Sequence, residues 1–178
     1  GIDWINAASV STNSTVNLAT KSFIIANRHG AIEEWVEIEN VATGDGDDSL
    51  VGSDTTNTLI AGRGDDNITP GYGNNVVDGG QGFDTVTFNG KYEDHQISYN
   101  SSTKKLSVVH SRNNGGNLQT DTHILTNVEL LKFDDLNVSL ETEIGNSAPQ
   151  VSKAILDKPL TVENDSDFSI LVPEDAFS

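Results

Sequence analysis

Five consecutive nonapeptides decide the fold of this chain: TGDGDDSLV (43–51), GSDTTNTLI (52–60), AGRGDDNIT (61–69), PGYGNNVVD (70–78) and GGQGFDTVT (79–87). The eighth residue of every unit is aliphatic: Leu50, Leu59, Ile68, Val77 and Val86. The sixth is always a short carboxylate or its amide: Asp48, Asn57, Asp66, Asn75 and Asp84. An uninterrupted period of this kind predicts a repeat architecture, in which each unit packs against its neighbours.

The composition of the unit indicates its shape. Glycines, mostly at the second and fourth positions, allow the first six residues to turn tightly, and the last three residues form a short strand with one inward aliphatic side chain. Two units then make one flattened coil, and strands stack at roughly 4.8 Å. We therefore predict an all-β fold with a parallel roll over 43–87. Units one, three and five line one edge of this roll, and units two and four line the other.

The charge balance excludes some classes of partner. Ten Lys and Arg face 27 Asp and Glu, a formal charge of −17, so we expect no nucleic acid and no anionic membrane surface as partner. No stretch of 18 apolar residues is present, so we expect no membrane insertion, and no N-terminal segment is typical of a signal peptide. Cysteine is absent, which excludes disulfides and thiolate metal sites. We expect the chain to be part of a longer protein.

The nine-residue pattern resembles the RTX (repeats-in-toxin) calcium-binding nonapeptide, G-G-x-G-x-D-x-U-x, of parallel β-rolls. The segments GIDWINAAS (1–9) and VEIENVATGDGDD (36–48) resemble those that lead into the roll of the secreted metalloproteases called serralysins. DTHILTNVELLKFDD (121–135) resembles a segment that closes such rolls. The protease signature H-E-x-x-H is missing, so we expect no enzyme activity in this chain.

The RTX resemblance implies calcium sites on the edge that carries the aspartates. In that family, carbonyls at the second and fourth positions and the carboxylate at the sixth hold Ca²⁺ between turns i and i+2. The ligands implied here are Gly44, Gly46, Asp48, Gly62, Gly64, Asp66, Gly80, Gly82 and Asp84. We expect two ions on this edge, and a weak site or none on the edge with Asn57 and Asn75. The alternative is that the aspartates are solvated turn residues.

Two further calcium sites are expected outside the repeats. The likeness to serralysins implies one at Gly1, Asp3, Glu37 and Glu39. An internal echo predicts another, since Gly82-Phe83-Asp84 repeats the pattern of 1–3 and Asn127-Val128-Glu129 repeats that of 37–39. Glu129 would approach Asp84, and the carbonyls of Gly82 and Asn127 would complete the site. In both cases the alternative is a solvated glutamate on a strand.

The repeats also indicate when the chain folds. Residues 43–87 contain eight Asp and one Arg, so without cations the segment repels itself, buries little and should be disordered. Calcium binding would then supply folding free energy. The resemblance to RTX proteins implies export through a one-step (type I) bacterial secretion system and folding outside the cell, so we expect a secreted or cell-surface location.

The domain organisation follows from these segments. We expect N-terminal strands over 1–42, with 36–40 as a strand, the roll over 43–87 and capping strands over 88–142. Within the cap we predict a hairpin (95–100 with 105–110), a polar loop over 111–121, and strands at 123–133 and 136–140. A linker (143–150) precedes 151–178, which resembles the opening of a truncated cadherin-like β-sandwich.

Two classes of function remain open at this stage. The first is a non-catalytic, calcium-folded RTX module of a large secreted or surface bacterial protein of adhesin type, monomeric, with any cell-surface or carbohydrate ligand bound through neighbouring domains. The alternative is the C-terminal calcium-binding and secretion region of a secreted hydrolase, lyase or serralysin-type metalloprotease whose catalytic domain lies upstream.

Overall fold

The structure is a computed structural model, and it describes residues 1–31, 37–141 and 150–151. These residues form two mixed β-sheets and one 3-10 turn, η1 (Tyr92–Asp94), and they contain no α-helix. The expectation of an all-β fold is therefore confirmed. Within the same residues, no helix has the length and apolarity needed to cross a membrane.

Both sheets contain a run of parallel strands, which continues into antiparallel strands at one end of the seven-stranded sheet and at both ends of the nine-stranded sheet. The seven-stranded sheet contains, in spatial order, β1 (Trp4–Asn6), β5 (Asn40–Ala42), β7 (Thr58–Arg63), β9 (Asn75–Gln81), β13 (Asn117–Thr126), β12 (Lys105–Asn114) and β11 (His95–Asn100). The nine-stranded sheet contains β16 (Gln150–Val151), β15 (Asn137–Glu141), β14 (Leu130–Lys132), β10 (Thr85–Thr87), β8 (Asn67–Thr69), β6 (Ser49–Val51), β2 (Thr15–Asn17), β3 (Ser22–Ile25) and β4 (Arg28–Ala31).

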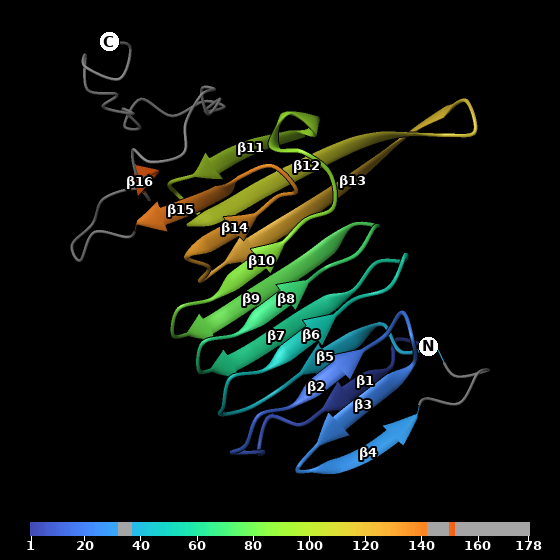
Figure 1. The fold of residues 1–178 in the computed structure, drawn as a ribbon, viewed down its shortest axis with the longest axis vertical. Helices are drawn as coiled ribbons and strands as arrows, with labels where there is room; N and C mark the ends of the chain where they lie inside the picture. The colour runs from blue at the N-terminus through green and yellow to red at the C-terminus, as the bar shows by residue number, and fades with distance from the viewer. Residues whose placement is uncertain (32–36, 142–149, 152–178) are drawn as a thin grey trace.

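Successive units of the repeat alternate between the two sheets. β6, β8 and β10 are the last three residues of units one, three and five, and they are parallel neighbours in the nine-stranded sheet. β7 and β9 begin in units two and four, continue into the first three residues of units three and five, and are parallel neighbours in the other sheet. Ser49 pairs with Asn67 and Thr58 with Val76, so each strand lies against the strand two units further on (Figure 1).

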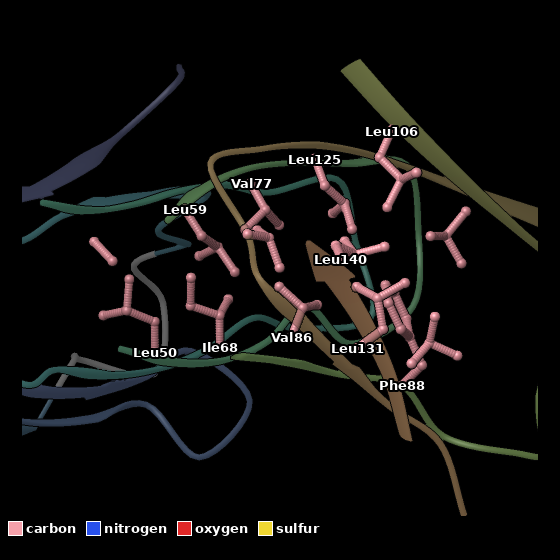
Figure 2. Close-up of a cluster of buried hydrophobic side chains, with 14 of the residues drawn as sticks. Leu50, Leu59, Ile68, Val77, Val86, Phe88, Leu106, Leu125, Leu131 and Leu140 are labelled. Carbon is pink, nitrogen blue, oxygen red and sulfur yellow. The ribbon is translucent and has the colours of Figure 1, made fainter. Parts of the chain in front are cut away.

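The core is a double row of aliphatic side chains between the sheets. Figure 2 shows one side chain from each turn pointing inward, in two facing rows that include Leu50, Ile68 and Val86 on one side and Leu59, Val77 and Leu125 on the other. All six are essentially inaccessible to solvent. Full burial of one such side chain contributes roughly 1.5–3 kcal/mol. The inward position is therefore the eighth residue of the unit, as predicted.

The cap departs from the prediction in one segment. The residues expected to form a polar loop over 111–121 instead extend β12 and β13 into a hairpin arm, paired from Leu106–Leu125 out to Asn114–Asn117. Gly115 and Gly116, both with positive φ, form the two-residue turn that such a hairpin requires. The loop prediction was wrong because strand pairing here does not depend on an apolar face.

The strand expected over 36–40 is also displaced. Val36 lies outside the described residues, 37–39 are not in a strand, and β5 begins at Asn40. The pairing sets this boundary, since Val41 lies opposite Leu59 and points into the core. The predicted hairpin (β11 and β12) is present, and the strand expected over 136–140 is β15. The strand expected over 123–133 is instead divided into the end of β13 and β14, which lie in different sheets, because the chain turns at Asn127 with φ +52°. Most of the linker and of the cadherin-like segment, 143–149 and 152–178, lies outside the described residues.

Candidate metal centre

Three aspartates are buried in a column along one edge of the repeat. Asp48, Asp66 and Asp84 each stand immediately before a strand of the nine-stranded sheet, and these strands, β6, β8 and β10, are neighbours. Their relative exposures are 1%, 1% and 0%. Neighbouring strands are about 4.8 Å apart, so the carboxylates are stacked at about that spacing. Two unit charges about 5 Å apart repel by roughly 3 kcal/mol at an effective dielectric constant of about 20.

One oxygen of each carboxylate is held by the main chain of the preceding turn. The amide of Asp48 donates to Oδ1 of Asp66 at 2.6 Å, and the amide of Asp66 donates to Oδ1 of Asp84 at 2.9 Å. Oδ1 of Asp48 accepts from the amide of Ser14 at 2.6 Å. These bonds fix the orientation of all three side chains in the same way.

The second oxygen of each carboxylate has no partner. Oδ2 of Asp48, Asp66 and Asp84 is buried and accepts no hydrogen bond. A buried carboxylate oxygen without a partner is costly, and native proteins satisfy nearly all buried polar atoms. Three such oxygens in one column therefore indicate a site for a positively charged partner.

The pKa values of the three aspartates also reflect the burial of carboxylates without a positively charged partner. Burial raises the pKa of Asp66 to about 7 and that of Asp84 to about 6, and neighbouring carboxylates add to both shifts. Burial also raises the pKa of Asp48. The folded chain alone therefore holds protons on these carboxyls more tightly than free aspartates do. A bound cation would reverse that preference.

The glycines bring main-chain carbonyls to the same edge. A Cβ on Gly62 would lie 2.2 Å from the carbonyl oxygen of Gly44, and a Cβ on Gly80 would lie 2.0 Å from that of Gly62. The second column, Gly46, Gly64 and Gly82, is stacked in the same way, with distances of 2.3 and 1.9 Å. Both columns use positive φ at most of their positions. Only glycine permits this stacking, which places the carbonyl oxygens of one turn against the glycines of the next.

The opposite edge has the same geometry but a different chemistry. The amide of Asn57 donates to Oδ1 of Asn75 at 2.7 Å, as the amide of Asp48 donates to Asp66. The remaining atom is here Nδ2, and it is satisfied. Asn75 Nδ2 donates to the carbonyls of Pro70 (3.1 Å) and Tyr72 (2.9 Å), and Asn57 Nδ2 donates to the carbonyl of Glu39 (2.9 Å). An amide group thus supplies the partial positive charge that the aspartate edge lacks.

A turn that the sequence did not reveal precedes the aspartate column. The carbonyls of Ala8 and Val10 lie against Gly44, and Asn13 Oδ1 accepts from the amide of Asp47 at 3.1 Å. Residues 8–14 therefore occupy the place of one more turn, although they contain no glycine or aspartate that could have signalled it.

The fifth position of the unit forms a second column, also missed. Asp47 Oδ1 accepts from the amide of Asp65 at 2.9 Å, and Asp65 Oδ1 accepts from the amide of Phe83 at 2.8 Å. Both aspartates are exposed, unlike the buried sixth position. The double aspartate in units one and three was the available signal for this column.

The predicted N-terminal site is assembled in part. The amide of Asp3 donates to Oε2 of Glu39 at 2.7 Å, which brings these two residues together across 36 positions. Gly1, Asp3 and Glu37 are exposed, and Glu37 and Glu39 line a small cavity of about 120 Å³ beside Lys21. At the other end, the amide of Asp84 donates to Oε2 of Glu129 at 2.7 Å, and the carbonyl oxygen of Asn127 and Oδ2 of Asp84 both approach Gly79.

Three of the four histidines are gathered in the cap. The rings of His95 and His110 are stacked with centroids 4.5 Å apart, and Phe88 contacts both His95 and His123. Burial lowers the pKa of His123 to about 4, so this side chain is neutral near pH 7. The side chain of His29 lies outside the described residues. These contacts give the three histidines packing roles.

Side-chain clusters of the usual metal-binding type are not found. Among residues 1–31, 37–141 and 150–151, no group of three or more His, Asp or Glu side chains is placed to hold a metal ion. Each pair of stacked turns contributes only two aspartates from the buried column, so any ion there would take its other ligands from carbonyls. No model of a known protein family matches the chain, and no curated protein matches it either.

Proposed function

We propose that this chain is a non-catalytic, calcium-binding RTX-type module in which the repeat forms a parallel β-roll. One contrast carries the proposal. At equivalent positions with equivalent Oδ1 hydrogen bonds, Asn75 Nδ2 is fully bonded, whereas Asp48, Asp66 and Asp84 each retain a buried oxygen without a partner. The sixth position of the unit is therefore a carboxylate on one edge only, where a cation would satisfy it.

The donor set favours calcium over other cations. Carboxylate and carbonyl oxygens are hard ligands, and Ca²⁺ accepts six to eight of them in flexible geometry, whereas Mg²⁺ requires a near-ideal octahedron. The column would hold ions through Asp48, Asp66 and Asp84. Carbonyls of the stacked glycines would complete the sites, with two ions between the three aspartate turns. The described part of the chain offers no cysteine and no histidine at this edge that would favour a transition metal.

Calcium would also control when the roll folds. The repeats bury one aliphatic side chain per unit, while their eight Asp and one Arg repel one another in the absence of cations. Extracellular calcium modules work at about 10⁻⁴–10⁻³ M, well above the levels that cytosolic sensors detect. The module would remain unfolded inside a bacterial cell and fold after secretion, as part of a larger surface or secreted protein.

Chelation tests the proposal directly. Hydrogen exchange and circular dichroism are measured on the full chain with a calcium chelator, with millimolar Ca²⁺ and with millimolar Mg²⁺. We expect 43–87 to lack protected amides in chelator and to regain them in Ca²⁺, with Mg²⁺ much less effective. Equal protection of 43–87 in chelator and in Ca²⁺ would reject the proposed function.

A further inference from the structure

The last aspartate of the column is joined to the cap by a hydrogen bond of the same kind. The amide of Asp84 donates to Oε2 of Glu129 at 2.7 Å, as the amides of Asp48 and Asp66 donate to the next carboxylate in the column. β14 pairs with β10 in parallel, with Thr85 opposite Leu130. Glu129 therefore continues the carboxylate column by one step, although it lies 45 residues beyond Asp84.

The same contact occurs at the other end of the chain. Asp3 donates its amide to Oε2 of Glu39 at 2.7 Å, which matches the contact between Asp84 and Glu129 in its atoms and its length. At the C-terminal end the carboxylates are withdrawn from water: Asp84 is fully buried and Glu129 is half-buried, whereas Asp3 is exposed. The C-terminal contact is thus the one with an unmet electrostatic requirement.

A carbonyl completes the donor set at this point. A Cβ placed on Gly79 would lie 2.0 Å from the carbonyl oxygen of Asn127 and 2.6 Å from Oδ2 of Asp84, so both oxygens approach Gly79 and only glycine fits there. Asn127 has φ +52°, and its side-chain amide donates to Oδ1 of Asp78 at 2.7 Å. The turn that presents the Asn127 carbonyl is therefore anchored by its own side chain.

We propose that Asp84 Oδ2, the Glu129 carboxylate and the Asn127 carbonyl bind one further Ca²⁺, which joins the last coil to the capping strands. This inference rests on the proposed function, because it extends the same carboxylate column. The geometric evidence for this site is separate. Oδ2 of Asp84 is buried without a partner, and the carboxylate of Glu129 and the carbonyl of Asn127, both from a distant segment, lie beside Asp84.

The ion would couple closure of the cap to folding of the roll. The amides of Glu129 and Leu130 both donate to the carbonyl of Asp84 at 3.0 Å, and the amide of Leu140 donates to the carbonyl of Glu129 at 2.7 Å. Residue 129 therefore connects β10, β14 and β15 through its main chain, while its side chain repels Asp84. A cation at this position would turn that repulsion into attraction, so the cap would close only when calcium is present.

Counting bound ions tests the inference. Native mass spectrometry and calorimetry are applied to the full chain, to Glu129→Gln and to the control variant Glu93→Gln. Residue 93 lies in η1. We expect Glu129→Gln to bind one Ca²⁺ fewer, or to bind it with at least about tenfold lower affinity, since removing a charged ligand weakens such sites. The control should match the wild type. Unchanged ion number and affinity in Glu129→Gln would overturn the inference.

Two further observations keep the test decisive. If the wild type binds no calcium, the proposed function itself fails, whereas a wild type that binds calcium alongside an unaffected Glu129→Gln rejects only this site. Should Glu129→Gln be insoluble, Glu129→Asp takes its place, because it keeps the charge but shortens the side chain. We expect the affinity for one ion to fall in Glu129→Asp, and identical affinities for every ion would again overturn the inference.

Discussion

The main-chain amide of Asp48 donates to Oδ1 of Asp66 at 2.6 Å, while Oδ2 of the same carboxylate is buried without a partner. One oxygen is thus used to build the stack of turns, and the other is left for a ligand. On the opposite edge, the amide of Asn57 donates to Oδ1 of Asn75 in the same way. The remaining atom of Asn75 is Nδ2, which donates to the carbonyl of Tyr72 and so has a partner. The two edges of one repeat therefore differ in their need for an external positive charge.

Replacing Asp66 with asparagine should make its turn resemble the opposite edge. The substituted side chain would still accept from the amide of Asp48, but its own amide group could donate to nearby carbonyls, as that of Asn75 does. We expect Asp66→Asn to reduce the number or affinity of bound Ca²⁺ ions at both sites that flank it, and to increase the strand signal in chelator. Calorimetry and circular dichroism measure the two effects, and unchanged calcium binding would contradict this expectation.

The aspartate column should make folding of the calcium-free chain depend on pH. The pKa of Asp66 is raised to about 7 and that of Asp84 to about 6, so the folded state holds protons more tightly than the unfolded state does. The resulting stability is complete below about pH 4 and is lost as the pH rises through about 6–7.

This dependence can be measured by unfolding in chelator at several pH values. We expect more strand signal at about pH 5 than at about pH 8, and calcium affinity should fall at low pH because protons compete for the same carboxylates. The pH effect should shrink in Asp66→Asn. A calcium-free chain whose order increases over this range, from about pH 5 to about pH 8, would contradict the prediction.

Gly80 should tolerate no side chain. Its φ is +101°, and a Cβ would lie 2.0 Å from the carbonyl oxygen of Gly62. Strain and overlap together should lower the free energy of unfolding of Gly80→Ala by about 2–5 kcal/mol in calcium. Gly115→Ala is the matched control, since it has φ +62° but no neighbour within 4 Å, and should cost only about 1–2 kcal/mol. Equal losses in urea unfolding would show that stacking of the turns adds nothing to the strain.

The repeat was predictable because its information is local. The nine-residue period fixed β6, β8 and β10, the alternation between two sheets and the inward side chains, since each follows from the positions of glycine and aliphatic residues within one unit. The internal echo between residues 1–3 and 82–84 also predicted that Glu129 approaches Asp84, and their contact is present. Calcium binding at these residues remains a prediction.

Features set by distant segments were not accessible in this way. The turn over 8–14 is defined by main-chain carbonyls that contact Gly44, and carbonyls have no sequence signature. The polar residues over 111–121 predict a loop, and they obscure the strand pairing that the two-glycine turn makes possible. The sequence alone also does not show that Asn75 Nδ2 donates to the carbonyls of Pro70 and Tyr72. This contact becomes visible only in the folded turn.

That last contact leads to a prediction of opposite sign to the one for Asp66. In Asn75→Asp, a carboxylate oxygen would replace the donor Nδ2 and face the carbonyls of Pro70 and Tyr72, 3.1 and 2.9 Å away. Loss of these buried hydrogen bonds should reduce the free energy of unfolding by about 1–3 kcal/mol at the lowest Ca²⁺ concentration that keeps the wild type folded. Millimolar Ca²⁺ should recover part of the loss, because the new carboxylate creates on this edge the same need for a positive charge that the aspartate edge already has.

Asn74→Asp is the control for Asn75→Asp. The exposed Oδ1 of Asn74 accepts from the amide of Thr122 at 2.9 Å, and an aspartate would keep that bond. A loss in Asn75→Asp that is identical at the lower and the higher Ca²⁺ concentration, measured by urea unfolding, would show that the difference between the edges does not lie in this one atom.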